Sequence, residues 1–150
     1  MINDLPFNSE KKTMVDKATS FDGDVKSDYS IEVRGIVKGN IVSNSDVFVY
    51  NQCLGCANGV NVYINPGSKV NKGINAFNNV VVKQDGVVNG DINCFKIEVY
   101  GEVENINAES TVFIGQSAIV HGDINCHELQ ADENCKIEGT VNIVYKKTNF

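Results

Sequence analysis

The chain contains no tryptophan, and its other aromatic residues are few. Seven Phe and five Tyr make up the aromatic total in 150 residues. Carbohydrate-binding surfaces stack sugar rings on aromatic side chains. A surface adhesin or carbohydrate-binding protein, which would also require export, is therefore only an alternative interpretation.

Long hydrophobic runs are also missing. No stretch approaches the ~20 apolar residues that a helix needs to cross a bilayer. The N-terminus shows no basic segment followed by an apolar core, so no secretory signal is visible. We therefore expect a cytoplasmic protein. Because that compartment is reducing, the five cysteines, an odd number, are expected to be free thiols.

Positive charge is scarce, with 13 Lys and Arg against 19 Asp and Glu, a net charge of −6. Nucleic-acid binding depends on clustered basic residues, so nucleic acid is not an expected partner. There are only two prolines, Val, Ile and Asn are abundant, and no useful helical periodicity follows residue 20. This composition indicates an all-β fold.

A five-residue phrase recurs along the chain: apolar, any residue, Gly, Asp or Asn, apolar. It is clearest in Val37-Lys38-Gly39-Asn40-Ile41 and in Val88-Asn89-Gly90-Asp91-Ile92, and weaker copies fill the gaps. Fixed-period self-similarity is the signature of a solenoid. The residues that close the eight copies are separated by 14–18 positions: Val25, Ile41, Ala57, Ile74, Ile92, Ile106, Ile124 and Val141.

Two further columns accompany this phrase. An alternating apolar pair follows each of the first seven copies, as in Val47/Val49 and Val112/Ile114, and alternation places both members on one face of a strand. An asparagine directly follows most closing residues, and stacked amides can hydrogen-bond along such a column. These asparagines are Asn58, Asn75, Asn93, Asn107, Asn125 and Asn142.

These periods predict a single-domain parallel β-helix with about eight coils of 16–18 residues and three faces per coil. Stacking at ~4.8 Å per coil would give a rod of roughly 38 Å. We expect a mobile N-terminal tail over 1–18, the β-helix over 19–145 and a short tail over 146–150. The spacing does not determine the hand of the helix.

The tandem Val-x-Gly-Asp-Ile phrases, with apolar pairs between them, resemble the bactofilin family over roughly residues 20–145. The resemblance implies a right-handed β-helix that polymerises end to end, without nucleotide, into bacterial cytoskeletal filaments. It also implies a scaffold for cell-shape or cell-wall factors rather than an enzyme. Family members commonly reach the inner face of the membrane through a short N-terminal segment.

A solenoid exposes its core and its unpaired strand edges at both ends, and soluble examples normally cap them. No convincing cap is visible in the sequence, and the alternative is that the two tails fold over the ends and cap them. We therefore predict self-association through the terminal coils. The residues expected there are Phe21, Val25, Ile31 and Val33 at one end and Ile137, Val141, Ile143 and Tyr145 at the other.

The N-terminus could also touch a membrane. Three apolar residues followed by two lysines form a weak anchor, which a polymer would strengthen through avidity. A disordered tail without a membrane role is the alternative. The residues of this possible membrane tail are Ile2, Leu5, Phe7, Lys11 and Lys12.

No pattern indicates a catalytic, metal or cofactor site. Cys53 and Cys56 have redox spacing but lack the βαβ setting, and no second ligand pair suits zinc. Cys94 and Cys126 fall among the small packing residues. His121 fills the outward slot of the repeat and has no positioned nucleophile nearby.

An acyltransferase on a left-handed β-helix is the remaining alternative. Such enzymes repeat a glycine-containing phrase strictly every six residues and carry an inserted loop with a catalytic histidine. This chain has neither feature, and it lacks phosphate-binding Gly motifs and the Gly-Gly-x-Gly-x-Asp calcium repeat.

Overall fold

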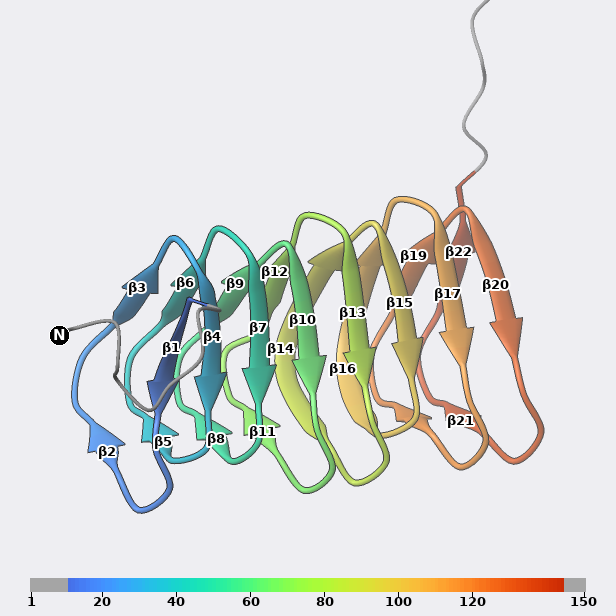
Figure 1. The fold of residues 1–150 in the computed structure, drawn as a ribbon. Coiled ribbons are helices and arrows are strands. Elements are labelled where there is room, and N and C mark those ends of the chain that lie inside the picture. Colours follow the sequence, from blue (N-terminus) through green and yellow to red (C-terminus); the bar gives the residue numbers. More distant parts are fainter. Residues whose placement is uncertain (1–10, 145–150) are drawn as a thin grey trace, which may run out of the picture.

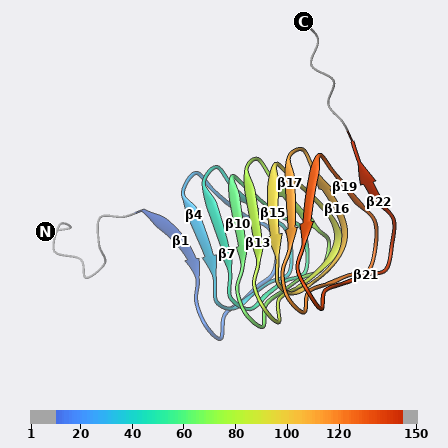
Figure 2. The same ribbon diagram turned by 90° about the vertical axis from the view of Figure 1, so that its right-hand side faces the viewer.

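The computed structural model describes residues 11–144 as a solenoid of parallel strands wound into eight turns (Figure 1). Its described elements are all strands. In Figure 1 the strands nearest to the viewer run downward while successive turns advance to the right, and Figure 2 shows the same sense from the C-terminal end. The winding is therefore right-handed, unlike the left-handed helix of the acyltransferase alternative.

The first face is one continuous eight-stranded sheet. Its registers confirm that the alternating apolar pairs stack on one another, as in Ile31↔Val47 and Val33↔Val49. The strands are β1 (Lys12–Val15), β4 (Ser30–Val33), β7 (Asp46–Val49), β10 (Asn61–Ile64), β13 (Asn79–Val82), β15 (Lys96–Val99), β17 (Thr111–Ile114) and β20 (Glu128–Ala131).

The other two faces share strands where the chain continues around a corner. The second face contains β2 (Ser20–Phe21), β5 (Ile36–Val37), β8 (Gln52–Cys53), β11 (Lys69–Val70), β18 (Ile119–Val120) and β21 (Lys136–Ile137). The third contains β3 (Val25–Ser27), β6 (Ile41–Ser43), β9 (Ala57–Gly59), β12 (Ile74–Ala76), β19 (Ile124–Cys126) and β22 (Val141–Ile143). The longer strands β14 (Val87–Cys94) and β16 (Glu102–Ala108) belong to both.

The third face confirms the column of closing residues. Val25 pairs with Ile41, Ile41 with Ala57, and Ala57 with Ile74. The same column continues through Ile92, Ile106, Ile124 and Val141. Unequal spacing is absorbed locally: β14 has one more residue than β16 between Val88 and Asp91, at the bulge that contains Gly90. Gly90 has φ +93°, a conformation that favours glycine.

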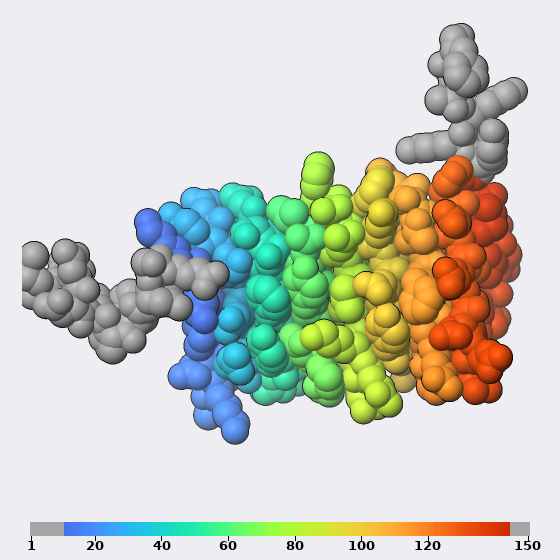
Figure 3. Space-filling model, turned by 45° about the vertical axis from the view of Figure 1, so that its right-hand side comes forward, coloured from blue at the N-terminus to red at the C-terminus, as the bar shows by residue number. Residues whose placement is uncertain are grey.

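The core is a set of continuous apolar stacks inside the three faces. Ile31, Ile64, Ile92 and Ile124 are fully buried, as are most inward valines. Parallel strands bury β-branched side chains well because each one packs on its equivalents above and below. The space-filling view shows the turns as closely packed bands along the rod (Figure 3).

The N-terminal boundary differs from the expected one. Lys12–Val15 lies within the stretch 1–18 that we expected to be a mobile tail, yet it forms β1 and pairs with β4 along its whole length. Val15 faces the core opposite Val33 and is buried. The described solenoid therefore begins one strand earlier than the repeat indicated.

Candidate functional site

The N-terminal end of the rod is formed by β1, β2 and β3. β1 is the first strand of the first face, so no other described strand pairs with its outer edge. Phe21 occupies the core column of the second face, above Val37, and is 43% exposed. Val25, also in the terminal turn, is buried.

Ile31 and Val33 do not lie at this end, which corrects their predicted role. β1 covers them, with Thr13 opposite Ile31 and Val15 opposite Val33, and both are 0% exposed. The repeat phrase starts at Phe21, so the additional strand before it was missed. On the first face, β1 therefore provides the terminal edge.

The C-terminal end is formed by β20, β21 and β22, the last strands of their faces. Val141 is 36% exposed, and Ile143 and Val144 are each 55% exposed, although Val141 and Ile143 continue columns that are buried in the turns before them. Ile137 is half-buried against the core. Tyr145 lies outside the described residues. An exposed strand edge with apolar side chains is an association hazard or an interface.

A ladder of asparagine amides runs along the third face and reaches the C-terminal end. Asn75 Nδ2 donates to Asn58 Oδ1 at 2.9 Å, and the pattern repeats at each turn up to Asn142, whose Nδ2 donates to Asn125 Oδ1 at 2.9 Å. This confirms the expected amide stack. The intermediate donors are Asn93, Asn107 and Asn125, at 3.0, 3.3 and 2.8 Å.

The cysteines form no bonded pair, and all five are free. Burial raises the pKa of Cys53 to about 11, and burial raises the pKa of Cys94 to about 12. Cys56 is half-buried, and its thiol donates to the carbonyl of Lys72 at 3.0 Å. Protonated, buried thiols are poor nucleophiles and metal ligands. Within residues 11–144 no cluster of three His, Cys, Asp or Glu side chains could hold a metal ion.

His121 bridges three turns on the outer side of the second face. Its Nε2 contacts a carboxylate oxygen of Glu102, and its Nδ1 lies 3.3 Å from Glu138 Oε2. The pKa of His121 is raised, mainly by hydrogen bonding to Glu102 and to a lesser extent by hydrogen bonding to Glu138. The repeat correctly predicted that this side chain points outward. Its two partners were not predicted, because they are 17 and 19 residues away in the sequence.

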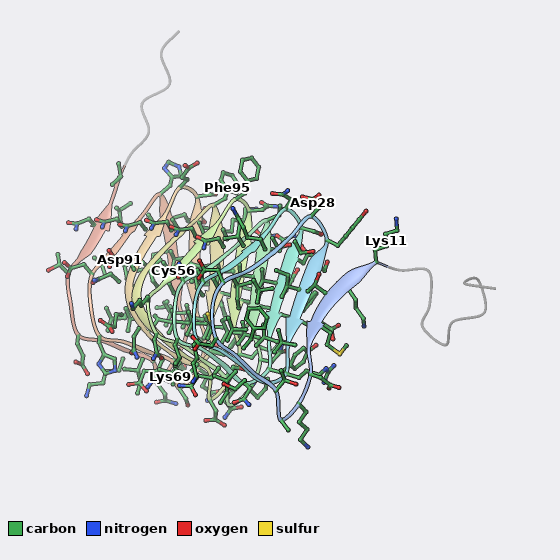
Figure 4. All side chains as sticks on the ribbon, turned by 90° about the vertical axis from the view of Figure 1, so that its left-hand side faces the viewer. Lys11, Asp28, Cys56, Lys69, Asp91 and Phe95 are labelled. Atoms are coloured by element: carbon green, nitrogen blue, oxygen red, sulfur yellow. The ribbon has the colours of Figure 1, made fainter. Side chains whose placement is uncertain are left out.

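A groove of about 1070 Å³, which sequence reasoning missed, runs parallel to the rod axis beside the amide ladder. Its floor is made of the small residues Ala76, Cys94, Ala108 and Cys126. Asparagines form one bank. The other bank consists of Phe77, Phe95, Glu109, His127 and Val144. Figure 4 places Phe95 on the same outer edge of the rod as Asp28.

The residues of the possible membrane tail are only partly described. Ile2, Leu5 and Phe7 lie outside the described residues. Lys11 Nζ lies 5.4 Å from the centre of the Tyr29 ring, and Lys12 Nζ lies 3.4 Å from Glu32 Oε1. Among residues 11–144 there is no helix long and apolar enough to span a membrane.

Comparison with protein families identifies the chain. The model of the bactofilin family, described as polymer-forming and cytoskeletal, matches residues 56–142. The chain belongs to the bactofilin family. This agrees with the eight-turn β-solenoid and with the resemblance carried by the Val-x-Gly-Asp-Ile phrases. Searches of curated proteins and of solved structures gave no match.

Proposed function

We propose that this bactofilin is a structural subunit that assembles end to end into filaments without nucleotide. The observation that carries the proposal is the pair of unpaired edges in the described chain. Within residues 11–144 no strand pairs with the outer edges of the terminal strands, and Ile143 and Val144 are each more than half exposed. Stacking the end turn of one chain on that of another would extend the sheets and cover these side chains.

The amide ladder supports the same proposal. Oδ1 of Asn142 accepts no hydrogen bond from residues 11–144, whereas the equivalent oxygens of Asn58 to Asn125 each accept one. A further turn would supply a donor. The subunit would then act as a cytoplasmic scaffold for cell-shape or cell-wall factors and not as a catalyst.

The decisive experiment places a charge at each end. Ile143→Lys and Phe21→Lys should each shorten the filaments seen by negative-stain microscopy, and the double variant should remain monomeric in sedimentation velocity, because a lysine cannot be buried unpaired. Tyr50→Lys is the matched control, since Tyr50 is an exposed aromatic on the side of the rod. Filaments that survive the double variant, or a native protein that stays monomeric at all salt and protein concentrations, would refute the proposal.

Peripheral membrane binding is a separate part of the proposal. The apolar residues Ile2, Leu5 and Phe7, with Lys11 and Lys12, could contact an anionic surface, and a filament would present many copies. Co-sedimentation with phosphatidylglycerol vesicles should be lost when Ile2, Leu5 and Phe7 are all changed to Ser. Retained binding by that variant would remove the tail from the proposal.

A further inference from the structure

The groove beside the amide ladder is uneven along its length. The turns are numbered from the N-terminal end by their closing residues, so that Ile74 lies in the fourth turn and Ile106 in the sixth. The outer bank of the groove carries phenyl rings in the fourth and fifth turns, at Phe77 and Phe95, which are 85% and 39% exposed. In the sixth and seventh turns the same bank carries Glu109 and His127, and the floor there is Ala108 and Cys126. One half of the groove therefore projects apolar phenyl rings, and the other half has polar side chains on its bank beside the small floor residues.

Positive and negative charges on this edge also lie in different halves of the groove. Lys96 lies in the fifth turn, with its Nζ 5.9 Å from the centre of the Phe95 ring. Glu109 lies in the sixth turn, on the bank of the groove. Neither side chain forms an ion pair with another residue of the described chain. A lysine and a carboxylate on adjacent turns are thus both available to an external partner.

We infer that the groove is a lateral contact between two copies of this chain that lie antiparallel. A two-fold axis perpendicular to the rod, between the fifth and sixth turns, brings each fourth turn opposite a seventh and each fifth opposite a sixth. Phe77 of one copy then lies level with Cys126 and His127 of the other, and Phe95 lies level with Ala108 and Glu109. The same operation brings Lys96 of each copy to Glu109 of the other, which satisfies both pairs at once.

A parallel arrangement lacks this match, because the rings would lie level with rings and Lys96 level with Lys96. The contact is also short: the groove spans four turn-to-turn intervals, or roughly 19 Å. One such strip gives a weak dimer. A filament repeats the strip in every subunit, so avidity multiplies its strength. The lateral contact would then pair filaments side by side. Its strength in a filament rests on the proposed end-to-end assembly.

The test is a charge exchange. Lys96→Glu and Glu109→Lys should each reduce the fraction of paired filaments in negative-stain images about tenfold, since each puts like charges together. The double exchange, Lys96→Glu with Glu109→Lys, should restore pairing. Phe77→Ser should also yield single filaments, whereas Tyr50→Ser, on another edge, should leave pairs intact. Rescue by the double exchange separates a direct contact from a loss of folding.

The outcomes distinguish this inference from the proposed function. Filaments that pair equally well in all variants, or that never pair, overturn the lateral contact and leave end-to-end assembly standing. If the native protein forms no filaments, end-to-end assembly fails. The lateral contact is then measured by sedimentation equilibrium at high protein concentration. Association that the single exchanges weaken and the double exchange restores supports the contact, and association that is absent or insensitive to them overturns it.

Discussion

Asn125 and Asn142, seventeen residues apart in the chain, are joined by a side-chain hydrogen bond of 2.9 Å. The bond is the last of a series that begins at Asn58, whose own Nδ2 donates to the carbonyl of Ile41 at 3.1 Å. Each amide donates toward the N-terminal end of the rod. The ladder therefore reports the register of every turn from the third to the eighth.

Removing one ladder amide should lower stability without changing the fold. Asn107 donates to Asn93 and accepts from Asn125, so Asn107→Ala loses two hydrogen bonds, a cost of about 1–2 kcal/mol. Thermal unfolding followed by circular dichroism should show a midpoint lower by roughly 2–4 °C per kcal/mol. Asn78→Ala, at an exposed asparagine outside the ladder, is the control. Equal midpoints for the two variants would contradict a stabilising ladder.

Interior and terminal isoleucines should differ strongly in their effect on the free energy of unfolding. Ile106 is fully buried, so Ile106→Ala should cost about 2–5 kcal/mol. Ile143 is 55% exposed, so Ile143→Ala should cost less than about 1 kcal/mol in the monomer. Urea unfolding at a protein concentration too low for assembly measures both changes. Similar losses would mean that the end of the rod is covered.

Substitutions at two glycines with positive φ should distinguish the cost of backbone strain from the cost of a steric clash. At Gly67 (φ +79°) an added Cβ meets no atom within 4 Å, so Gly67→Ala should cost only about 1–2 kcal/mol of conformational strain. At Gly73 (φ +96°) the Cβ would lie 2.4 Å from the carbonyl oxygen of Asp91 in the next turn. Gly73→Ala should therefore cost about 3 kcal/mol or more. Urea unfolding should rank the two variants in this order, and the reverse order would refute the close approach.

The His121 bridge should make stability depend on pH. The pKa of His121 is raised in the folded protein. Its contribution to folding stability is therefore fully present below the unfolded-state pKa of 6.5, and it is lost as pH rises through the folded-state pKa. Hydrogen bonding to His121 lowers the pKa of Glu138. The contribution of Glu138 to folding stability is therefore present above its unfolded-state pKa of 4.5, and it is lost as pH falls through its folded-state pKa.

Between pH 4.5 and 6.5 both contributions are therefore present. The unfolding midpoint of native protein should exceed that of His121→Gln by more at pH 5.5 than at pH 9. His127→Gln, which removes the other histidine, is the comparison for a general effect of losing an imidazole. A difference between native protein and His121→Gln that is constant with pH would show that the bridge does not titrate with folding.

The repeat in the sequence was enough to predict the fold, the apolar columns and the amide ladder, because side chains of the same kind recur at most turns. The first strand was missed because Lys12–Val15 places Thr13 where later turns have Val, Ile or Leu, so the apolar alternation is weaker there. Four corner residues with positive φ were also missed. Ala18, Asp85, Ser117 and Asn134 adopt a left-handed conformation that composition does not mark.

The surface sites were harder to predict than the core. A repeat specifies which residues stack, but it does not specify how outward side chains lean across turns. The contact of His121 with Glu102 is diagonal to the column in which Glu104, His121 and Glu138 succeed one another, since Val103 pairs with Val120. The signal for the groove was present only as two phenylalanines, Phe77 and Phe95, at one repeat position that holds Asp28, Asn44, Glu109, His127 and Val144 in other turns.

The sheet hydrogen bonds of this rod run along its long axis, from each turn to the next. Inside one chain the polypeptide also links successive turns covalently, whereas a junction between chains would have only non-covalent contacts. A filament pulled along its length would therefore break at the joints between subunits before any subunit unravels. Mechanical load would shorten such a filament into whole, reusable pieces.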